Sequence, residues 1–292
     1  MVLEYTAERA AKLLSVLRRE MGLSSTLVGR LKWKNALFVN GSPAHTDCPV
    51  RPGDQIRVEM AEQAEGFDPE PMPLCVLYED EALIAVDKPA GLLVHPSPAR
   101  NSGTLANGLL DYYIRTGQAA AIHPVTRLDR DTLGVVLLAK SAHVHAKLCA
   151  LLKEGRLEKT YHASVFGAPP AETGSITLPI GRVGGGSLLR TVREDGQAAK
   201  TDYRVLNLCG EYSVLELHPR TGRTHQLRVH CAFSGFPILG DPQYNTPESA
   251  ALSERLGLVT QQLCAVSLCF PHPLTGETVE IFSEQRVFGE AP

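Results

Sequence analysis

The sequence feature that most constrains the fold is a cluster of charges that runs straight into an apolar segment. Residues 127–134 read RLDRDTLG, and Val135–Ala139 follow without interruption. A short aliphatic run entered through Thr and Gly predicts a buried strand with a polar approach loop. A carboxylate at the mouth of such a strand loses hydration, so we expect a cation close to Asp129. The alternative is that the charges pair with one another on a surface turn: Arg127, Asp129, Arg130 and Asp131.

Length and composition fit a globular protein with one large domain and one small one. The chain has 292 residues, of which 43% are hydrophobic and 21% charged. A formal net charge of -3 and an isoelectric point near 6.4 argue against a protein that coats nucleic acid with its whole surface, but leave room for a local basic face. Seven scattered cysteines predict reduced thiols. Without a signal-peptide pattern or an apolar run of membrane-spanning length, we expect a monomeric cytoplasmic protein that does not enter membranes.

Residues 1–60 predict a small α+β domain with basic helix faces. Apolar residues recur at helical spacing from Thr6 to Met21, and Ser24 or Ser25 can cap a second helix. Ala36–Val39 predicts a strand, with a hairpin turn at Asn40-Gly41 and a further strand at Gln55–Val58. The two helices carry five basic residues that predict a contact with RNA phosphates or, alternatively, a solvated face: Arg18, Arg19, Arg30, Lys32 and Lys34.

Residues 61–73 predict a linker to a larger domain over residues 74–292. The stretch is acidic, carries several prolines and has little apolar periodicity. We therefore expect few contacts to cross it.

The larger domain mixes predicted strands and helices, which indicates an α+β fold. The expected strands are Cys75–Tyr78, Leu83–Val86 and Leu157–Phe166, and the expected helices are residues 104–115 and 141–155. The glycines at 184–186 predict a flexible hairpin and not a phosphate loop, because no Lys-Ser or Lys-Thr follows them.

A turn that feeds a helix is predicted around residues 220–230. On such a helix His225 and Arg228 can point the same way, with Arg223 at the entry. His225 and His230 are five residues apart, which spreads them around the helix, so we expect no shared metal ion.

Several segments resemble the motifs of one enzyme family. Residues 127–134 are similar to the catalytic motif of the pseudouridine synthases, in the branch that modifies uridines of bacterial large-subunit ribosomal RNA and some tRNAs. Residues 158–163 resemble the second motif and residues 220–244 the third, and the resemblance extends over 74–284. Residues 1–60 resemble the compact RNA-binding domain first described in a small-subunit ribosomal protein.

The resemblance implies a fold and an activity. The expected fold is a catalytic domain on a mixed, mainly antiparallel sheet with flanking helices, preceded by the small α+β RNA-binding domain. The implied reaction isomerises uridine in structured RNA, either rRNA or tRNA, to pseudouridine. It needs no cofactor or metal because the uracil is only detached, turned and rejoined through C5.

The resemblance also implies roles for individual residues. Asp129 would be the catalytic carboxylate, Tyr161 would stack on the target base, and Arg228 would pair with Asp129. Asp129 could act as a nucleophile at C1′ or as a base at C2′, and both routes stay open. The remaining expected RNA contacts in this domain are Arg127, Arg130, Arg223 and His225.

Three positions depart from the family pattern. Thr126 and Cys264 stand where the family usually has His, and Leu133 stands where it usually has Ser. Thr126 and Leu133 slightly favour a rival interpretation, a catalytically weak or inactive RNA-binding or ribosome-assembly protein on the same fold. The presence of Asp129, Tyr161 and Arg228 together argues against it. A glycoside hydrolase that uses Asp129 and Asp131 is a second rival, but an aromatic content of 6% does not suggest a sugar cleft.

Overall fold

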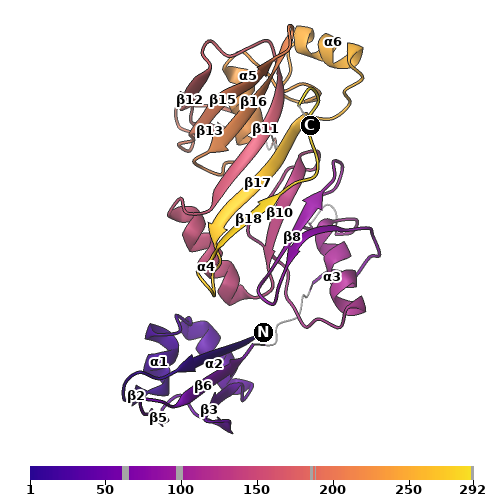
Figure 1. Ribbon diagram of the computed structural model, residues 1–292. Helices are drawn as coiled ribbons and strands as arrows, with labels where there is room; N and C mark the ends of the chain where they lie inside the picture. Colours follow the sequence, from indigo (N-terminus) through magenta and orange to yellow (C-terminus); the bar gives the residue numbers. More distant parts are fainter. Residues whose placement is uncertain (61–65, 97–100, 185–186, 188, 291–292) are drawn as a thin grey trace.

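The computed structural model describes residues 1–60, 66–96, 101–184, 187 and 189–290, and it has two parts, each with its own apolar core (Figure 1). The elements of the small part are β1 (Val2–Thr6), β2 (Ala11–Lys12), α1 (Leu13–Arg19), α2 (Ser25–Trp33), β3 (Leu37–Val39), β4 (Ser42–Pro43), β5 (Pro49–Val50) and β6 (Gln55–Glu59).

The large part contains four helices and twelve strands among its described residues. The helices are α3 (Leu105–Arg115), α4 (Ala142–Lys153), α5 (Gln226–Phe233) and α6 (Pro247–Arg255). The strands are β7 (Cys75–Glu79), β8 (Leu83–Lys88), β9 (His123–Pro124), β10 (Leu133–Ala139), β11 (Glu158–Phe166), β12 (Thr173–Ile176), β13 (Ile180–Arg182), β14 (Arg190–Val192), β15 (Thr201–Leu208), β16 (Tyr212–Pro219), β17 (Leu263–Pro271) and β18 (Thr278–Phe282).

The small part packs α1 and α2 against a four-stranded sheet in the order β1-β6-β3-β4. The predicted second helix is confirmed, and Ser24 caps it by accepting a hydrogen bond from the Leu27 amide. The turn at Asn40-Gly41 is confirmed as well, because both residues have positive φ angles. The prediction of a helix from Thr6 to Met21 is wrong in its first half. Helix α1 begins only at Leu13, because the residues up to Thr6 form β1 and pair with β6.

The large part is built on a mixed sheet in the order β12-β15-β16-β11-β17-β10-β8-β7, with β18 beside β17 and β9 beside β10. Among the strand pairs within the described ranges, only β10 and β17 run parallel. Strands β11 and β17 form the long centre of the sheet (Figure 1). The predicted mixed, mainly antiparallel sheet with flanking helices is therefore confirmed.

Strand β10 is buried on both faces, as its unbroken apolar run predicts. Val136 and Leu138 pack on one face with side chains of α3 and α5. Val135 and Leu137 pack on the other face with side chains of α4. The charged segment before β10 is thus attached to a strand that is buried from Gly134 to Ala139.

The segment between the two parts contacts the large domain where the structure describes it. The Asn107 Nδ2 donates to the carbonyl oxygen of Asp68 at 2.8 Å, and the Gly103 amide donates to the Glu70 carboxylate at 2.8 Å. Phe67 packs against the main core. The expectation of few contacts is therefore wrong for residues 66–73, while residues 61–65 lie outside the described part.

Three further expectations concern local chemistry. The seven cysteines are free, but only Cys231 and Cys264 are buried. Strands β13 and β14 form the predicted hairpin, although Gly185 and Gly186 lie outside the described residues. None of the described helices has the length and apolar character that crossing a bilayer requires.

Candidate active site

The loop that carries Asp129 is fixed at both ends. The Thr126 hydroxyl accepts a hydrogen bond from the Leu137 amide at 2.9 Å, and the Thr132 hydroxyl accepts one from the Gln261 amide group at 2.5 Å. Gly134 has a φ angle of 103°, and a Cβ there would collide with the backbone of Ala265 on β17. The close contact between β10 and β17 therefore requires glycine at this position.

Lys88, at the end of β8, hydrogen-bonds to the same loop through its ammonium. Its ammonium is fully buried and donates to the carbonyl oxygens of Pro89, Leu92 and Arg130 at 2.8, 2.9 and 2.8 Å. Burial lowers the pKa of Lys88 to about 8, although Asp131 and Asp129 act in the opposite direction. Lys88 thus holds the backbone next to Asp129 in place.

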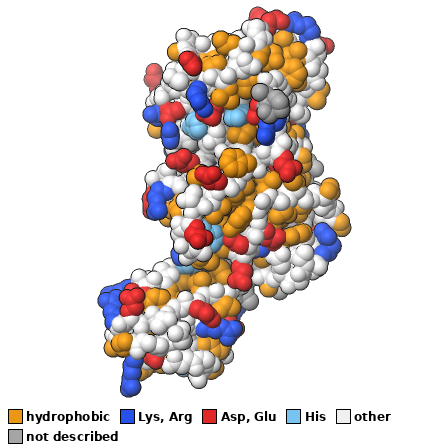
Figure 2. Space-filling model, viewed as in Figure 1, with side chains coloured by type: hydrophobic (Ala, Val, Ile, Leu, Met, Phe, Trp, Pro, Cys, Tyr) orange, Lys and Arg blue, Asp and Glu red, His pale blue; other side chains and the backbone are white. Residues whose placement is uncertain are grey.

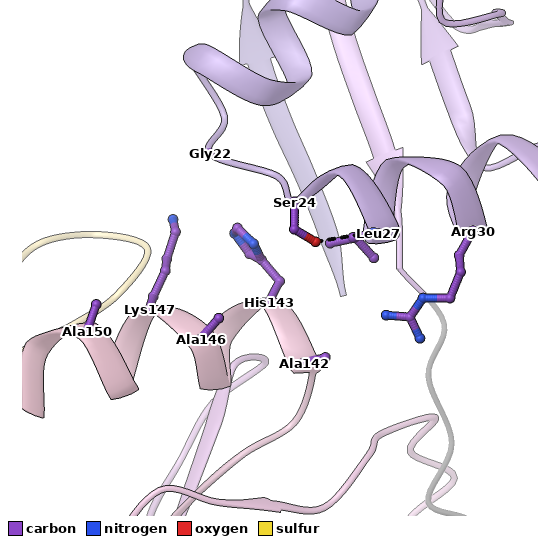
Figure 3. Close-up of a pocket in the computed structure, with 9 residues that line it drawn as sticks. All are labelled: Gly22, Ser24, Leu27, Arg30, Ala142, His143, Ala146, Lys147 and Ala150. Atoms are coloured by element: carbon purple, nitrogen blue, oxygen red, sulfur yellow. Dashed lines mark hydrogen bonds between the residues drawn. The ribbon is translucent and has the colours of Figure 1, made fainter. Parts of the chain in front are cut away.

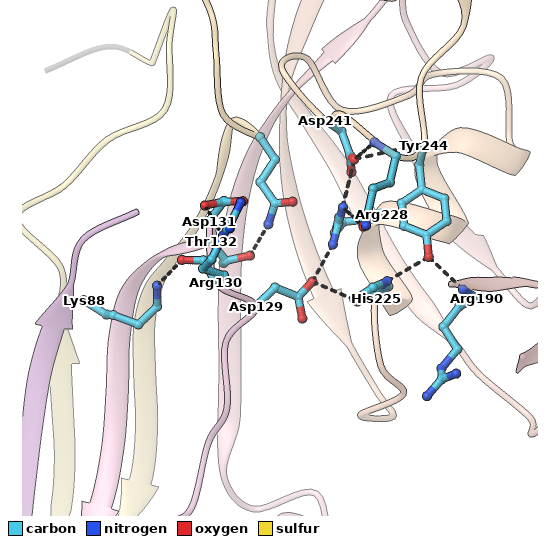
Figure 4. Close-up of polar contacts among 12 residues, drawn as sticks. Lys88, Asp129, Arg130, Asp131, Thr132, Arg190, His225, Arg228, Asp241 and Tyr244 are labelled. Atoms are coloured by element: carbon cyan, nitrogen blue, oxygen red, sulfur yellow. Dashed lines mark hydrogen bonds and ion pairs between the residues drawn. The ribbon is translucent and has the colours of Figure 1, made fainter. Parts of the chain in front are cut away.

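Arg228, on α5, reaches the loop from the other side. Its Nε and Nη2 donate to the two oxygens of Asp241 at 2.7 and 2.9 Å, and its Nη1 donates to Asp129 Oδ2 at 3.0 Å (Figure 4). Burial alone would lower the pKa of Arg228, but the hydrogen bonds and the charge of Asp241, together with Asp129, raise it. The guanidinium therefore stays charged.

The two carboxylates on Arg228 differ in access to solvent. The side chain of Asp241 is 0% exposed, whereas that of Asp129 is 28% exposed. Asp241 also accepts the backbone amides of Gln243 and Tyr244, so its hydrogen-bonding capacity is used within the protein. Asp241 consequently orients Arg228, and Asp129 is the carboxylate that a substrate can reach.

His225 lies on the accessible side of the same cluster. Its Nε2 is 4.0 Å from Asp129 Oδ2, and its Nδ1 is 2.7 Å from the Tyr244 hydroxyl. The Tyr244 hydroxyl accepts a hydrogen bond from the Arg190 amide at 2.9 Å, so it can donate its own proton to Nδ1 of His225. In a neutral His225, the ring hydrogen then lies on Nε2. Burial lowers the pKa of His225, and Arg228 adds to this while Asp129 opposes it. A neutral imidazole therefore presents its N–H toward Asp129.

Tyr161 lies on β11 with 8% of its surface exposed, inside the main core. Burial and the negative charge of Asp129 raise the pKa of Tyr161, so its hydroxyl stays protonated. A protonated tyrosine at the edge of the core can stack against a planar ring or donate a proton, but it is a poor base.

The structure brings Asp129, His225 and Arg228 together, with Tyr161 close enough for the charge of Asp129 to act on it. The alternative, in which these charges pair with one another on a surface turn, holds only for Arg130 and Asp131, which form an ion pair at 3.0 Å. Arg127 is exposed on the same loop. The other predicted RNA contacts are exposed and lie apart from this cluster: Arg223, which donates to the Ala198 carbonyl oxygen, and Arg18, Arg19, Arg30, Lys32 and Lys34 of the small part.

Two of the departures from the family pattern are neighbours in space. Leu133 lies opposite Cys264 in the parallel pair of β10 and β17. Both pack in an apolar cluster with Val214 and Val266. An aliphatic side chain and a buried thiol therefore stand at one contact where the family usually has two polar side chains.

Sequence reasoning missed Lys88 and Asp241 as site residues. Both lie in segments that the resemblance covers. Lys88 stands between Asp87 and Pro89, and Asp241 stands between Gly240 and Pro242. Their burial depends on strands and helices that are distant in sequence, so local periodicity carries no signal for it.

A separate cavity lies between the two parts of the molecule (Figure 3). It has a volume of about 280 Å³ and lies between α2 and α4. No carboxylate is among its described lining residues, which are Gly22, Ser24, Leu27, Arg30, Ala142, His143, Ala146, Lys147 and Ala150. The cavity therefore does not offer the acid–base chemistry found at Asp129. Among the described residues, no cluster of His, Cys, Asp or Glu has the geometry to hold a metal ion.

Comparison with known proteins identifies the family to which the chain belongs. The sequence model of the RNA pseudouridylate synthase family matches residues 82–233. The uncharacterised RNA pseudouridine synthase YjbO of Bacillus subtilis is 36% identical over 263 residues, which is 89% of this chain and 90% of that protein. The ribosomal large subunit pseudouridine synthase D of Neisseria meningitidis is 37% identical over 255 residues, which is 84% of this chain and 68% of that protein.

A solved structure shows the same fold. Human RNA pseudouridylate synthase domain containing 4 superimposes with a TM-score of 0.59 at 26% identity, over 72% of this chain and 88% of that chain. The chain therefore belongs to the RNA pseudouridine synthase family, and it is an isomerase that acts on RNA. The enzyme class expected from the sequence is confirmed, and the glycoside hydrolase interpretation is wrong.

Proposed function

We propose that Asp129 is the carboxylate that performs the isomerisation, with Arg228 and Tyr161 as its partners. The observation that carries this proposal is that Arg228 holds one oxygen of Asp129 at 3.0 Å while the carboxylate remains accessible. The neighbouring guanidinium supplies a counter-charge for Asp129 when bound RNA excludes water. Asp241 cannot take this role, because its side chain is closed to solvent.

The reaction conserves all atoms of the nucleotide. The bond from N1 to C1′ breaks, the uracil turns, a new bond joins C5 to C1′, and the proton lost from C5 is balanced by one gained at N1. Asp129 serves either as the nucleophile at C1′ or as the base at C2′. Tyr161 stacks on the uracil, and its protonated hydroxyl suits a donor. The uridine leaves the RNA stack to reach Asp129, at a cost of a few kcal/mol that stacking and phosphate contacts offset.

The substrate that best fits is a uridine in ribosomal RNA. The relative from Neisseria meningitidis carries a name that refers to the large ribosomal subunit. A tRNA uridine is the second candidate, and mapping distinguishes the two. We further propose that the enzyme works as a monomer in the cytoplasm. The free cysteines are consistent with a reducing compartment.

The small domain is proposed as an RNA clamp that precedes the catalytic domain of residues 74–292. Its five predicted basic contacts are exposed, and Lys and Arg side chains are visible at separate places on this domain in Figure 2. The alternative is that these charges only stabilise helix ends, because Arg18, Arg19, Arg30 and Lys32 lie in the last turns of α1 and α2. The dependence of RNA affinity on salt separates the two interpretations.

The experiment that tests the catalytic proposal maps pseudouridine by carbodiimide labelling in RNA from a strain that lacks the gene. Purified protein should restore labelling at specific uridines, and Asp129→Asn should abolish it without a change in melting temperature, because the change removes only a charge. Asp131→Asn is the matched control and should retain activity. Near-normal turnover by Asp129→Asn would overturn the assignment. If the wild-type protein restores no pseudouridine labelling, that result would favour the inactive RNA-binding interpretation.

A further inference from the structure

Lys159 lies beside the proposed site but takes no part in the contacts described so far. It is two residues before Tyr161 on β11, and the register of β11 against β17 shifts between Thr160 and Tyr161. Its Nζ lies 4.0 Å from the position that a Cβ of Gly222 would occupy. The ammonium therefore lies beside the loop that leads into α5, close in the chain to Tyr161.

The environment of Lys159 contrasts with that of two other buried lysines. Lys88 and Lys140 each donate to three acceptors, which for Lys140 are Glu79 Oε1, the Asp80 carbonyl oxygen and Gln118 Oε1. Lys159 is partly buried, yet no hydrogen bond or ion pair from any other described residue reaches its ammonium. A partly buried cation without an acceptor is unfavourable unless a ligand supplies one.

The surroundings of Lys159 favour an anion as that ligand. Burial lowers the pKa of Lys159, and no carboxylate in the described part of the chain opposes this shift. Arg223 is exposed on the adjacent loop, and only its Nε is engaged, with the Ala198 carbonyl oxygen. An anionic group placed here would gain a strong hydrogen bond to one cation and long-range attraction from a second.

We propose that Lys159 binds a backbone phosphate adjacent to the uridine that enters the site. This inference rests on the proposed function, because it places the uracil on Tyr161 and the ribose at Asp129. A nucleotide held in that way has its own flanking phosphates within a few residues' reach of Tyr161, where the ammonium of Lys159 is available. Lys159 then fixes the register of the RNA strand, and the site recognises a nucleotide within a chain in preference to a free nucleoside.

The test uses a synthetic RNA hairpin that carries the mapped uridine, in three forms. One form has only phosphates, and the others have a neutral methylphosphonate on the 5′ or the 3′ side of the uridine. Lys159→Met removes the charge, Lys159→Arg retains it, and Lys153→Met, an exposed lysine at the end of α4, is the control. RNA affinity, its dependence on salt and the single-turnover rate are measured for each combination of protein variant and hairpin.

Lys159→Met should weaken binding of the all-phosphate hairpin about tenfold or more. It should also reduce the slope of log K against log salt by about 1, while Lys153→Met and Lys159→Arg stay near wild type. One of the two methylphosphonates should cost the wild-type protein a similar factor and Lys159→Met almost nothing further. The melting temperature of Lys159→Met should not fall, because the change removes an unpaired buried charge.

Two outcomes would overturn the inference. The first is a wild-type protein that isomerises the hairpin and tolerates both methylphosphonates. The second is a Lys159→Met variant that binds the all-phosphate hairpin as tightly as wild type does, or whose loss of RNA affinity adds fully to the loss caused by each methylphosphonate. If the wild-type protein does not isomerise the uridine at all, the proposed function itself fails, and that result is distinct from both.

Discussion

Arg228 and Asp241 form a buried two-point ion pair, with Nε to Oδ2 at 2.7 Å and Nη2 to Oδ1 at 2.9 Å. The planar guanidinium is thereby fixed in orientation, and the only nitrogen left, Nη1, points at Asp129. The position of the accessible carboxylate therefore depends on a carboxylate that substrate does not contact.

This arrangement predicts that stability and activity can be separated. Arg228→Met should lower the free energy of unfolding by about 3–5 kcal/mol, because it leaves Asp241 buried without a partner. The double change Arg228→Met with Asp241→Leu should recover much of that loss, since it replaces the whole pair by apolar side chains. Both variants should be inactive, because neither supplies a cation to Asp129.

The measurement is urea unfolding together with pseudouridine mapping. Asp241→Leu alone is the control for the second site and should also be destabilised, since it leaves Arg228 with Asp129 and Gln243 as its only acidic or amide partners among the described residues. Recovery of activity in the double variant would show that Asp129 does not need the guanidinium.

Gly134→Ala should destabilise the protein and inactivate it. The residue has a φ angle of 103°, and a side chain would collide with the Ala265 backbone. Backbone strain of this kind costs about 1–3 kcal/mol, and the displacement of β17 adds to it. Gly117→Ala is the matched control, because its φ of 68° is also positive but the space around it is open.

Thermal unfolding of the two glycine variants checks this prediction. Gly117→Ala should lose only the strain of a left-handed residue, roughly 1–2 kcal/mol, and should keep its activity. Equal losses in both variants would mean that the close approach of β10 to β17 is not required.

Stability should fall as the pH is lowered from about 7 to about 5. Burial lowers the pKa of four histidines, His95, His145, His225 and His230. Below the unfolded value of about 6.5, the unfolded chain takes up protons that the folded chain resists, so acid favours unfolding. Above that value all four are neutral in both states, and their contribution to the pH dependence vanishes.

Urea unfolding at several pH values measures this slope. Carboxylates with lowered pKa values, such as Glu79 and Asp80, lose their stabilising contribution only at more acidic pH. His145→Gln, on α4 and away from Asp129, should make the slope between pH 7 and 5 shallower. A wild-type protein with constant stability over this window would contradict the prediction.

Removal of the small domain should weaken RNA binding more than it affects the fold. A chain that starts at Gly66 retains the contacts of Phe67, Asp68 and Glu70 with the large domain, so its melting temperature should stay close to that of the large domain in the full chain. A chain that starts at Leu74 lacks these contacts and should unfold at a lower temperature. In both, log K should depend less steeply on log salt.

The single tryptophan supplies an independent readout for the full chain. Trp33 ends α2 and is 86% exposed between Lys32 and Lys34. RNA that contacts this helix should quench its emission at low salt, and added salt should restore it. RNA binding that leaves both the emission and the truncated protein's affinity unchanged would show that the small domain is not a clamp.

Sequence reasoning succeeded where the signal is local. Ser24, Thr104 and Ser141 each cap the helix that was expected to follow them, and positive φ angles appear at Asn40 and Gly41 as the turn requires. The stretch before Leu13 was mistaken for helix because its partner strand, β6, lies about fifty residues further along the chain. Helical spacing of apolar residues could not reveal that pairing.

The residues of the candidate site also fall into those that the sequence predicted and those that it did not. The proximity of Asp129 and Arg228 was expected from the resemblance and is present at 3.0 Å. The buried charges of Lys88 and Asp241 were not expected, because burial is a property of the assembled sheet and helices. The Leu133–Cys264 contact gives a physical reason for two residues that, in sequence, were only deviations from a pattern.

The parallel pairing of β10 with β17 extends over just Leu133–Cys264 and Gly134–Ala265. On one side of this seam lie β7, β8 and the loop of Asp129; on the other lie β11 with Tyr161 and α5 with Arg228. Neither half of the sheet holds the complete set of proposed reacting groups. The relative position of these groups therefore depends on how the two half-sheets pack at the seam. A substitution in the seam should change the geometry of the site even if the substituted residue does not contact RNA.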